Sequence, residues 1–106
     1  MKAILKDKRE AGFTLADIPV PEIGRNEVLI KVEASALCRS DVDVYEWTPL
    51  VEKANYDLPF VMGHEFAGTI VKTGEDVQGY EPGDRVAGET HIPCGYCETC
   101  RTGNQH

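Results

Sequence analysis

Residues 27–36, EVLIKVEASA, decide the fold class, because apolar and polar side chains alternate along them. Val28, Ile30, Val32 and Ala34 fall on one face of an extended strand, whereas the opposite face is mixed. This period of two predicts a strand with one face packed on a core and the other partly in water.

The segments around this strand predict further short strands separated by turns. We expect them over Lys2–Lys6, Phe13–Ile18, Phe66–Lys72 and Asp84–Gly88, with Gly and Pro residues between them. Ser40 is predicted to cap a short helix over Asp41–Trp47, and Thr48–Asp57 is predicted as an irregular, exposed loop. Five or six short strands with little helix indicate a mainly β fold, a partly open β-barrel with short helices.

The composition favours a single acidic domain over residues 1–106 and disfavours several classes of partner. Eleven Lys and Arg residues against 18 Asp and Glu give a net charge of −7, which argues against binding to nucleic acid or to an anionic membrane surface. No apolar stretch approaches the ~18 residues of a membrane span, and the charged N-terminus does not resemble a secretory signal. Together with the four cysteines, this predicts a reducing, cytoplasmic location.

The stretch CGYCETC, residues 94–100, is typical of a metal-binding lobe. Cys94, Cys97 and Cys100 recur at every third position, so three soft sulfur ligands can converge on zinc or on an iron–sulfur centre. A disulfide would use two of the three thiols and leave one over. A closed zinc site needs a fourth ligand, for which His91, His106 or a solvent molecule are candidates.

Cys38 and the pair His64–Glu65 are individually ambiguous and more informative together. Cys38 alone is more often a small buried apolar residue than a ligand. Each nevertheless lies where a strand pattern breaks, and a Cys, a His and a carboxylate suit an open zinc site. Adjacent strand residues point to opposite faces, so His64 and Glu65 can share one ion only if Gly63 permits a turn or bulge.

Four motifs in this order resemble the medium-chain zinc-dependent alcohol dehydrogenases. They are CRSD at residues 38–41, GHEFAGTIVKTGEDV at 63–77, YEPGDRV at 80–86 and the cysteine lobe. In the second motif the matching positions are Gly63, His64, Glu65, Gly68, Gly74 and Val77. Residues 43–47, DVYEW, and 87–95, AGETHIPCG, are most similar to the threonine dehydrogenases of that family, although polyol dehydrogenases share much of the scaffold.

The resemblance implies a GroES-like fold and a role for each matching residue. Cys38 and His64 would bind the catalytic zinc, with Glu65 as third ligand or close neighbour, while Ser40 would take the proton of the alcohol bound to zinc. Asp41 would orient His64 or merely cap the helix. Listed by implied role, the remaining residues are Arg39 at the pyrophosphate of NAD or NADP, His91 near the substrate, and Cys94, Cys97 and Cys100 at a structural zinc.

The sequence also departs from the family pattern. The family often has His at the position of Asp43, as the outer end of the proton relay, and the lobe over residues 89–106 lacks its fourth thiolate. No GxGxxG dinucleotide fingerprint occurs. We therefore expect a catalytic domain separated from its Rossmann domain: inactive alone, prone to self-association, and part of a homo-oligomeric parent enzyme that oxidises a small secondary alcohol.

Two other classes of function stay open from the sequence. A non-enzymatic metal-binding or interaction module would share the fold but would not need Cys38, Ser40 and His64 to converge. An iron–sulfur electron carrier would use the CxxCxxC run but would also need a fourth Cys followed by Pro, which RTGNQH at residues 101–106 does not supply.

Overall fold

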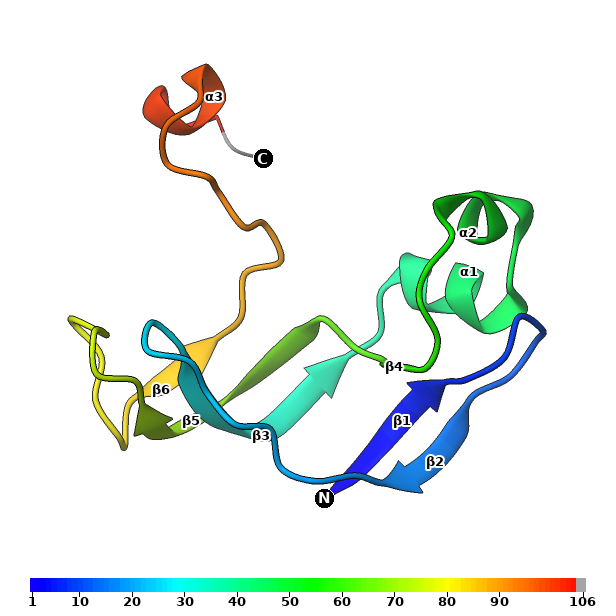
Figure 1. Cartoon of the computed structure of the whole chain (residues 1–106), viewed down its shortest axis with the longest axis horizontal. Helices are drawn as coiled ribbons and strands as arrows, with labels where there is room; N and C mark the ends of the chain where they lie inside the picture. Colours follow the sequence, from blue (N-terminus) through cyan, green and yellow to red (C-terminus); the bar gives the residue numbers. More distant parts are fainter. Residues whose placement is uncertain (105–106) are drawn as a thin grey trace.

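The first of two sheets contains both strands of an N-terminal hairpin. In this computed structural model, which describes residues 1–104, β1 (Lys2–Lys6) pairs with β2 (Thr14–Asp17) and with the two-residue β4 (Phe60–Val61). The strand order is β2-β1-β4 and both pairings are antiparallel (Figure 1). The strand predicted over residues 2–6 is confirmed, and β4 falls in a segment for which no strand was predicted.

The second sheet holds the long strand predicted from the alternating stretch. It has the order β3-β5-β6, with β3 (Val28–Ala36), β5 (Glu65–Thr73) and β6 (Arg85–Ala87) all antiparallel. A Cβ on Gly68 would lie 2.1 Å from the carbonyl oxygen of Lys31, so only glycine allows the two long strands to approach this closely. The register pairs Ala36 with Glu65, which brings the end of β3 beside the start of β5.

Two short helices follow β3, and the second corrects the sequence prediction. Helix α1 (Arg39–Glu46) is capped by Cys38, not by Ser40, which lies inside its first turn. Helix α2 (Pro49–Ala54) occupies the segment predicted as an irregular loop, so that prediction is wrong. Proline fits the first turn of a helix, where its missing N–H costs nothing, and Thr48 precedes it in an extended conformation.

The core of the described residues is small. Val51 and Ile70 are its buried apolar side chains, and Val32 is 54 % exposed, so the predicted burial of the apolar face of residues 27–36 fails in its second half. The reason is that the two sheets stay open instead of closing into a barrel. The radius of gyration is 15.9 Å, against about 13 Å for a compact domain of this length.

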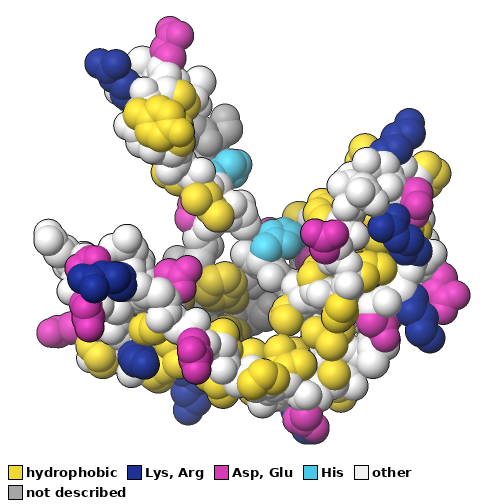
Figure 2. All heavy atoms as spheres, viewed as in Figure 1, with side chains coloured by type: hydrophobic (Ala, Val, Ile, Leu, Met, Phe, Trp, Pro, Cys, Tyr) yellow, Lys and Arg dark blue, Asp and Glu magenta, His cyan; other side chains and the backbone are white. Residues whose placement is uncertain are grey.

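An extended arm leaves the second sheet after β6 and ends in helix α3 (Glu98–Arg101) (Figure 1). A deep notch separates this arm from the side of the molecule that carries α1 and α2; one histidine side chain lies on the arm and another at the base of the notch (Figure 2). Within residues 1–104, no helix has the length and apolar character needed to cross a membrane.

Candidate metal centre

Cys38 lies at the junction between β3 and α1. It has an extended backbone, with φ −95° and ψ 159°, and is followed directly by the first helical residue. Its N–H donates a hydrogen bond of 2.8 Å to Oδ2 of Asp41, three residues later. This reciprocal cap fixes where α1 begins and therefore where the Cys38 thiol points.

His64 and Glu65 reach the same place from the start of the neighbouring strand, β5. Gly63 has φ +99°, a left-handed conformation in which a residue with a Cβ is strained, and the chain turns there between β4 and β5. The Ser35 hydroxyl donates a 3.1 Å hydrogen bond to the Glu65 carbonyl, which ties the first residue of β5 to β3. The turn allows the two adjacent side chains to face one region instead of opposite faces of the sheet.

The structure brings Cys38, His64 and Glu65 together. One ligand atom from each lies within 4.8 Å of the other two, and all three residues are half-buried. Zinc binds sulfur at about 2.3 Å and nitrogen or oxygen at about 2.0–2.2 Å, so the ligand atoms of a tetrahedral site lie roughly 3.3–3.8 Å apart. The donor set and its spacing therefore fit one zinc ion after small side-chain adjustments.

Asp41 supports two of these ligands at once. Its side chain is almost fully buried; Oδ1 lies 3.4 Å from Nδ1 of His64, while Oδ2 accepts the Cys38 N–H. The two roles weighed for Asp41 from the sequence, helix cap and orienting partner of the imidazole, thus occur together. A carboxylate on one imidazole nitrogen leaves the other nitrogen for a metal.

The thiol and the imidazole also influence each other. Hydrogen bonding with Ser40 lowers the pKa of the Cys38 thiol, and hydrogen bonding with Cys38 raises the pKa of the His64 imidazole. Both shifts favour a thiolate beside an imidazolium. The thiolate is the form that binds metal, and the imidazole becomes a ligand when it gives up its proton.

The cysteine lobe forms a second group on the arm. Sγ atoms of Cys94, Cys97 and Cys100 lie within 4.8 Å of one another, and the Cys94–Cys100 pair is 3.7 Å apart. Hydrogen bonding, first with the Thr99 hydroxyl at 3.1 Å, lowers the pKa of Cys97 to about 6. Of the predicted fourth ligands, His106 lies outside the described residues.

Two predicted site residues have local partners instead of a place beside the three ligands. Nδ1 of His91 lies 2.7 Å from Oε1 of Glu89 on the arm, and hydrogen bonds from His91 lower the pKa of that carboxyl to about 2. Arg39 is 79 % exposed on α1, and among residues 1–104 its ion-pair partner is Asp43, at 3.5 Å.

Sequence reasoning missed the support given by Ser35 and the capping role of Cys38. The capping role of Cys38 could have been recognised in the sequence, because an acceptor three residues after the cap is the spacing of a reciprocal cap. The role of Ser35 had none, since it depends on the register of two strands 30 residues apart.

Comparisons with known proteins show which family the chain is similar to. The family model of the alcohol dehydrogenase GroES-like domain matches residues 24–106. The L-threonine 3-dehydrogenases of Legionella pneumophila and Escherichia coli are 47 % and 46 % identical over 106 residues, covering all of this chain and 31 % of each relative. The chain thus spans about a third of the length of these curated relatives.

Solved structures give the same result. An NAD-dependent alcohol dehydrogenase superimposes with a TM-score of 0.84 at 34 % identity, covering 99 % of this chain and 30 % of that one. A zinc-binding dehydrogenase from Sinorhizobium meliloti, solved with NADP, has a TM-score of 0.78 at 30 % identity, covering 96 % and 28 %.

Proposed function

This chain belongs to the alcohol dehydrogenase GroES-like domain family, and we propose that it is the metal-binding catalytic part of a zinc-dependent, NAD(P)-linked dehydrogenase. Its substrate would be a small secondary alcohol, of the threonine type in first place and a polyol in second. The names of the similar curated proteins support the first choice.

One observation carries the proposal: the convergence of Cys38 with the adjacent pair His64 and Glu65, which lies in a separate part of the chain. A β-domain without a metal site would gain nothing by placing these three ligand types together, because burying or half-burying them costs free energy of desolvation. A zinc ion held there would act as a Lewis acid that makes the hydroxyl of a bound alcohol more acidic.

The residues around the three ligands would hold the metal and move the proton. Asp41 keeps the imidazole of His64 in place, as its contact at 3.4 Å indicates. Ser40 hydrogen-bonds with the Cys38 thiol, so its short hydroxyl is within reach of a substrate hydroxyl at the same metal. An open depression of about 350 Å³ is lined by Ala36, Glu65 and Phe66 among others, so it borders one of the three proposed ligands.

The proposal also assigns roles to residues other than the three ligands and their immediate neighbours. Arg39 is exposed and weakly paired, which suits a cofactor phosphate, and the nicotinamide cofactor itself would be held mainly by a separate nucleotide-binding domain. His91 would contact the substrate from the arm. Cys94, Cys97 and Cys100 would hold a second, structural zinc ion.

We further propose a cytoplasmic, homo-oligomeric parent enzyme. All four cysteines are free and three have metal-type spacing, which suits a reducing compartment. The open sheets leave apolar side chains such as Val32 and Val71 exposed, and an uncovered apolar surface favours association with another domain or a second copy.

The test is cobalt binding at the half-buried site. In a background where Cys94, Cys97 and Cys100 are replaced by serine, added Co²⁺ should give the sulfur-to-metal charge-transfer band of one thiolate. Cys38→Ser should abolish that band, and His64→Ala should weaken binding by about 100-fold or more. Lys2→Met is the control, because Lys2 pairs with Asp17 at the surface of the first sheet, and it should leave the titration unchanged.

The same titration separates the alternative classes. Cobalt binding that survives both Cys38→Ser and His64→Ala would sink the catalytic-site proposal and leave an interaction module. An iron–sulfur carrier predicts visible absorbance in the purified, iron-containing protein, but three thiols in each chain's described lobe fall short of the usual four ligands.

A further inference from the structure

Lys6, the last residue of β1, is a fully buried lysine. Its exposed fraction is 0 %, in a structure where few side chains are covered. The ammonium group uses all three of its protons on backbone carbonyls: Glu10 at 2.5 Å, Gly12 at 3.0 Å and Tyr45 at 3.1 Å. Such complete pairing is required for a buried charge, because an unpaired ammonium would lose its hydration without compensation.

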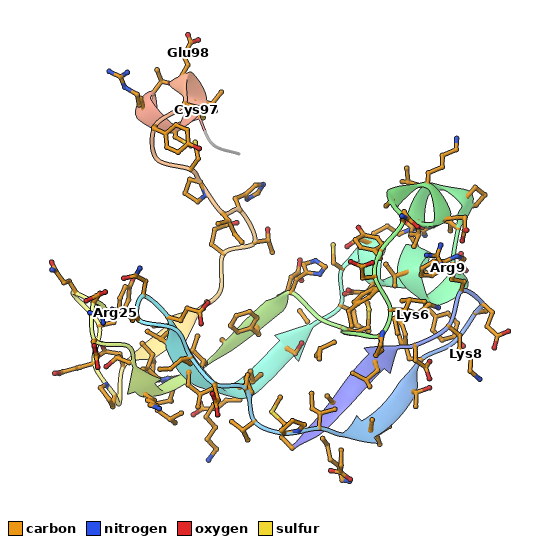
Figure 3. All side chains as sticks on the ribbon, viewed as in Figure 1. Lys6, Lys8, Arg9, Arg25, Cys97 and Glu98 are labelled. Carbon is orange, nitrogen blue, oxygen red and sulfur yellow. The ribbon has the colours of Figure 1, made fainter. Side chains whose placement is uncertain are left out.

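Aromatic rings complete the surroundings of this ammonium. The nitrogen lies 5.2 Å from the centroid of Trp47 and 5.6 Å from that of Phe13, which are cation–π distances. Arg9 from the hairpin tip also lies over Trp47, and it pairs with Glu52 of α2 (Figure 3). The tip of the β1–β2 hairpin is therefore held against the turn between α1 and α2 by cation–π contacts and an ion pair.

The third carbonyl is the informative one, since Tyr45 belongs to the last turn of α1. Carbonyls at a helix C-terminus lack partners within the helix and carry its negative partial charge. Helix α1 has no basic residue in its own last turn. Lys6 supplies the cation from another strand, and the Gly12 N–H donates a second hydrogen bond, of 3.0 Å, to the same oxygen.

The opposite end of α1 carries the site. Cys38 caps it, Ser40 and Asp41 lie in its first turn, and Asp41 contacts His64. A helix of eight residues is a rigid rod of roughly 12 Å, so fixing one end fixes the direction of the other.

We propose that Lys6 is a positioning residue for the metal site: by holding the C-terminal carbonyl of α1, it sets where Cys38 and Asp41 stand relative to His64. It touches no ligand and acts through the helix. This inference rests on the proposed metal site, so its test begins with a measurement on the site itself.

The test uses the 106-residue chain with Cys94, Cys97 and Cys100 replaced by serine, titrated with Co²⁺. If this parent protein shows no thiolate-to-cobalt band, the proposed function fails before Lys6 is examined. If it does, Lys6→Met should weaken cobalt binding by about tenfold, the lower range for groups that orient a ligand. Lys2→Met is the matched control, because Lys2 lies on the same strand and pairs only with Asp17 at the surface.

A graded variant keeps the test decisive if Lys6→Met does not fold. Lys6→Gln retains two N–H donors without the charge, so its cobalt affinity should fall between those of the parent and Lys6→Met. The structural control is the cysteine lobe, titrated in a chain with Cys38→Ser and intact Cys94, Cys97 and Cys100. Loss confined to the Cys38 site supports the proposal. Equal loss at both sites, or unchanged cobalt binding in both Lys6 variants, overturns it.

Discussion

The two candidate metal groups are built in opposite ways. Cys38 and the pair His64–Glu65 come from separate elements and are half-buried; the Ser35–Glu65 hydrogen bond joins two strands beside them, and the Asp41–His64 contact joins α1 to the residue before β5. The cysteine lobe takes its three ligands from seven consecutive residues on an extended arm, and its hydrogen bonds join near neighbours in sequence.

The two groups therefore depend on different parts of the structure. A site assembled across the fold exists only while the sheets keep their register, whereas a site assembled within one short loop depends on its own turn geometry and on its metal. Mutations in the sheets should therefore affect the first group and spare the second. The following experiments test this contrast by comparing metal binding at the two groups.

Gly68→Ala should have the largest effect. Its new Cβ would lie 2.1 Å from the Lys31 carbonyl oxygen, so β5 must move away from β3, at a cost of about 3 kcal/mol in the free energy of unfolding. Cobalt binding at Cys38 and His64 should be lost while binding at the lobe persists.

Gly79→Asn is the control for this substitution. Gly79 has open space around it and a left-handed φ of +79°, which asparagine tolerates. Parallel loss of both metal groups in Gly68→Ala would show that the lobe also depends on the second sheet.

Asp41→Asn should have an intermediate effect. It removes the carboxylate that faces Nδ1 of His64 and accepts the Cys38 N–H, so we expect a loss of about 10–100-fold in metal affinity at that site. Asp43→Asn, on the same helix, should change the affinity little, since Asp43 pairs only with Arg39. Unchanged affinity in Asp41→Asn would mean that the buried carboxylate serves only the helix cap.

His91→Ala should have the smallest effect, confined to the arm. Hydrogen bonds from the His91 backbone N–H and, second, from its ring lower the pKa of Glu89 from 4.5 to about 2; the substitution removes only the ring's share, so the pKa of Glu89 should rise part of the way toward its usual value. Because the folded pKa is the lower one, this pair stabilises the arm above pH 4.5, and that contribution is lost as the pH falls through about 2.

A carboxyl-detected NMR titration of Glu89 measures this shift. The side chain of Glu89 is 64 % exposed, so solvent screening keeps the gain in stability small. A wild-type Glu89 that titrates at its usual value would show that the turn at residues 89–91 does not form in solution.

The sequence predicted what depends on neighbouring residues and missed what depends on distant ones. The strand over Lys2–Lys6 was predicted with its correct bounds because its short apolar run and the turn that follows are local features. Helix α2 was missed because a six-residue helix leaves little periodic pattern, although Pro49 marked its start.

The open sheets limited the prediction in a different way. The apolar face of β3 implied a covered strand, but coverage depends on what packs against it, and residues 1–104 leave Val32 largely exposed. For the site, the residue types pointed to Cys38, His64 and Glu65, whereas the hold of Lys6 on α1 joins residues 39 positions apart and has no signature in the sequence.

The environment of Trp47 gives the molecule a built-in optical reporter. It is the single tryptophan of the chain, and its indole lies beside the Lys6 ammonium and the Arg9 guanidinium while its ring N–H donates to Glu52. Because cations close to an indole change its emission, the ultraviolet fluorescence of Trp47 reports whether the hairpin stays packed against the helices, without any label.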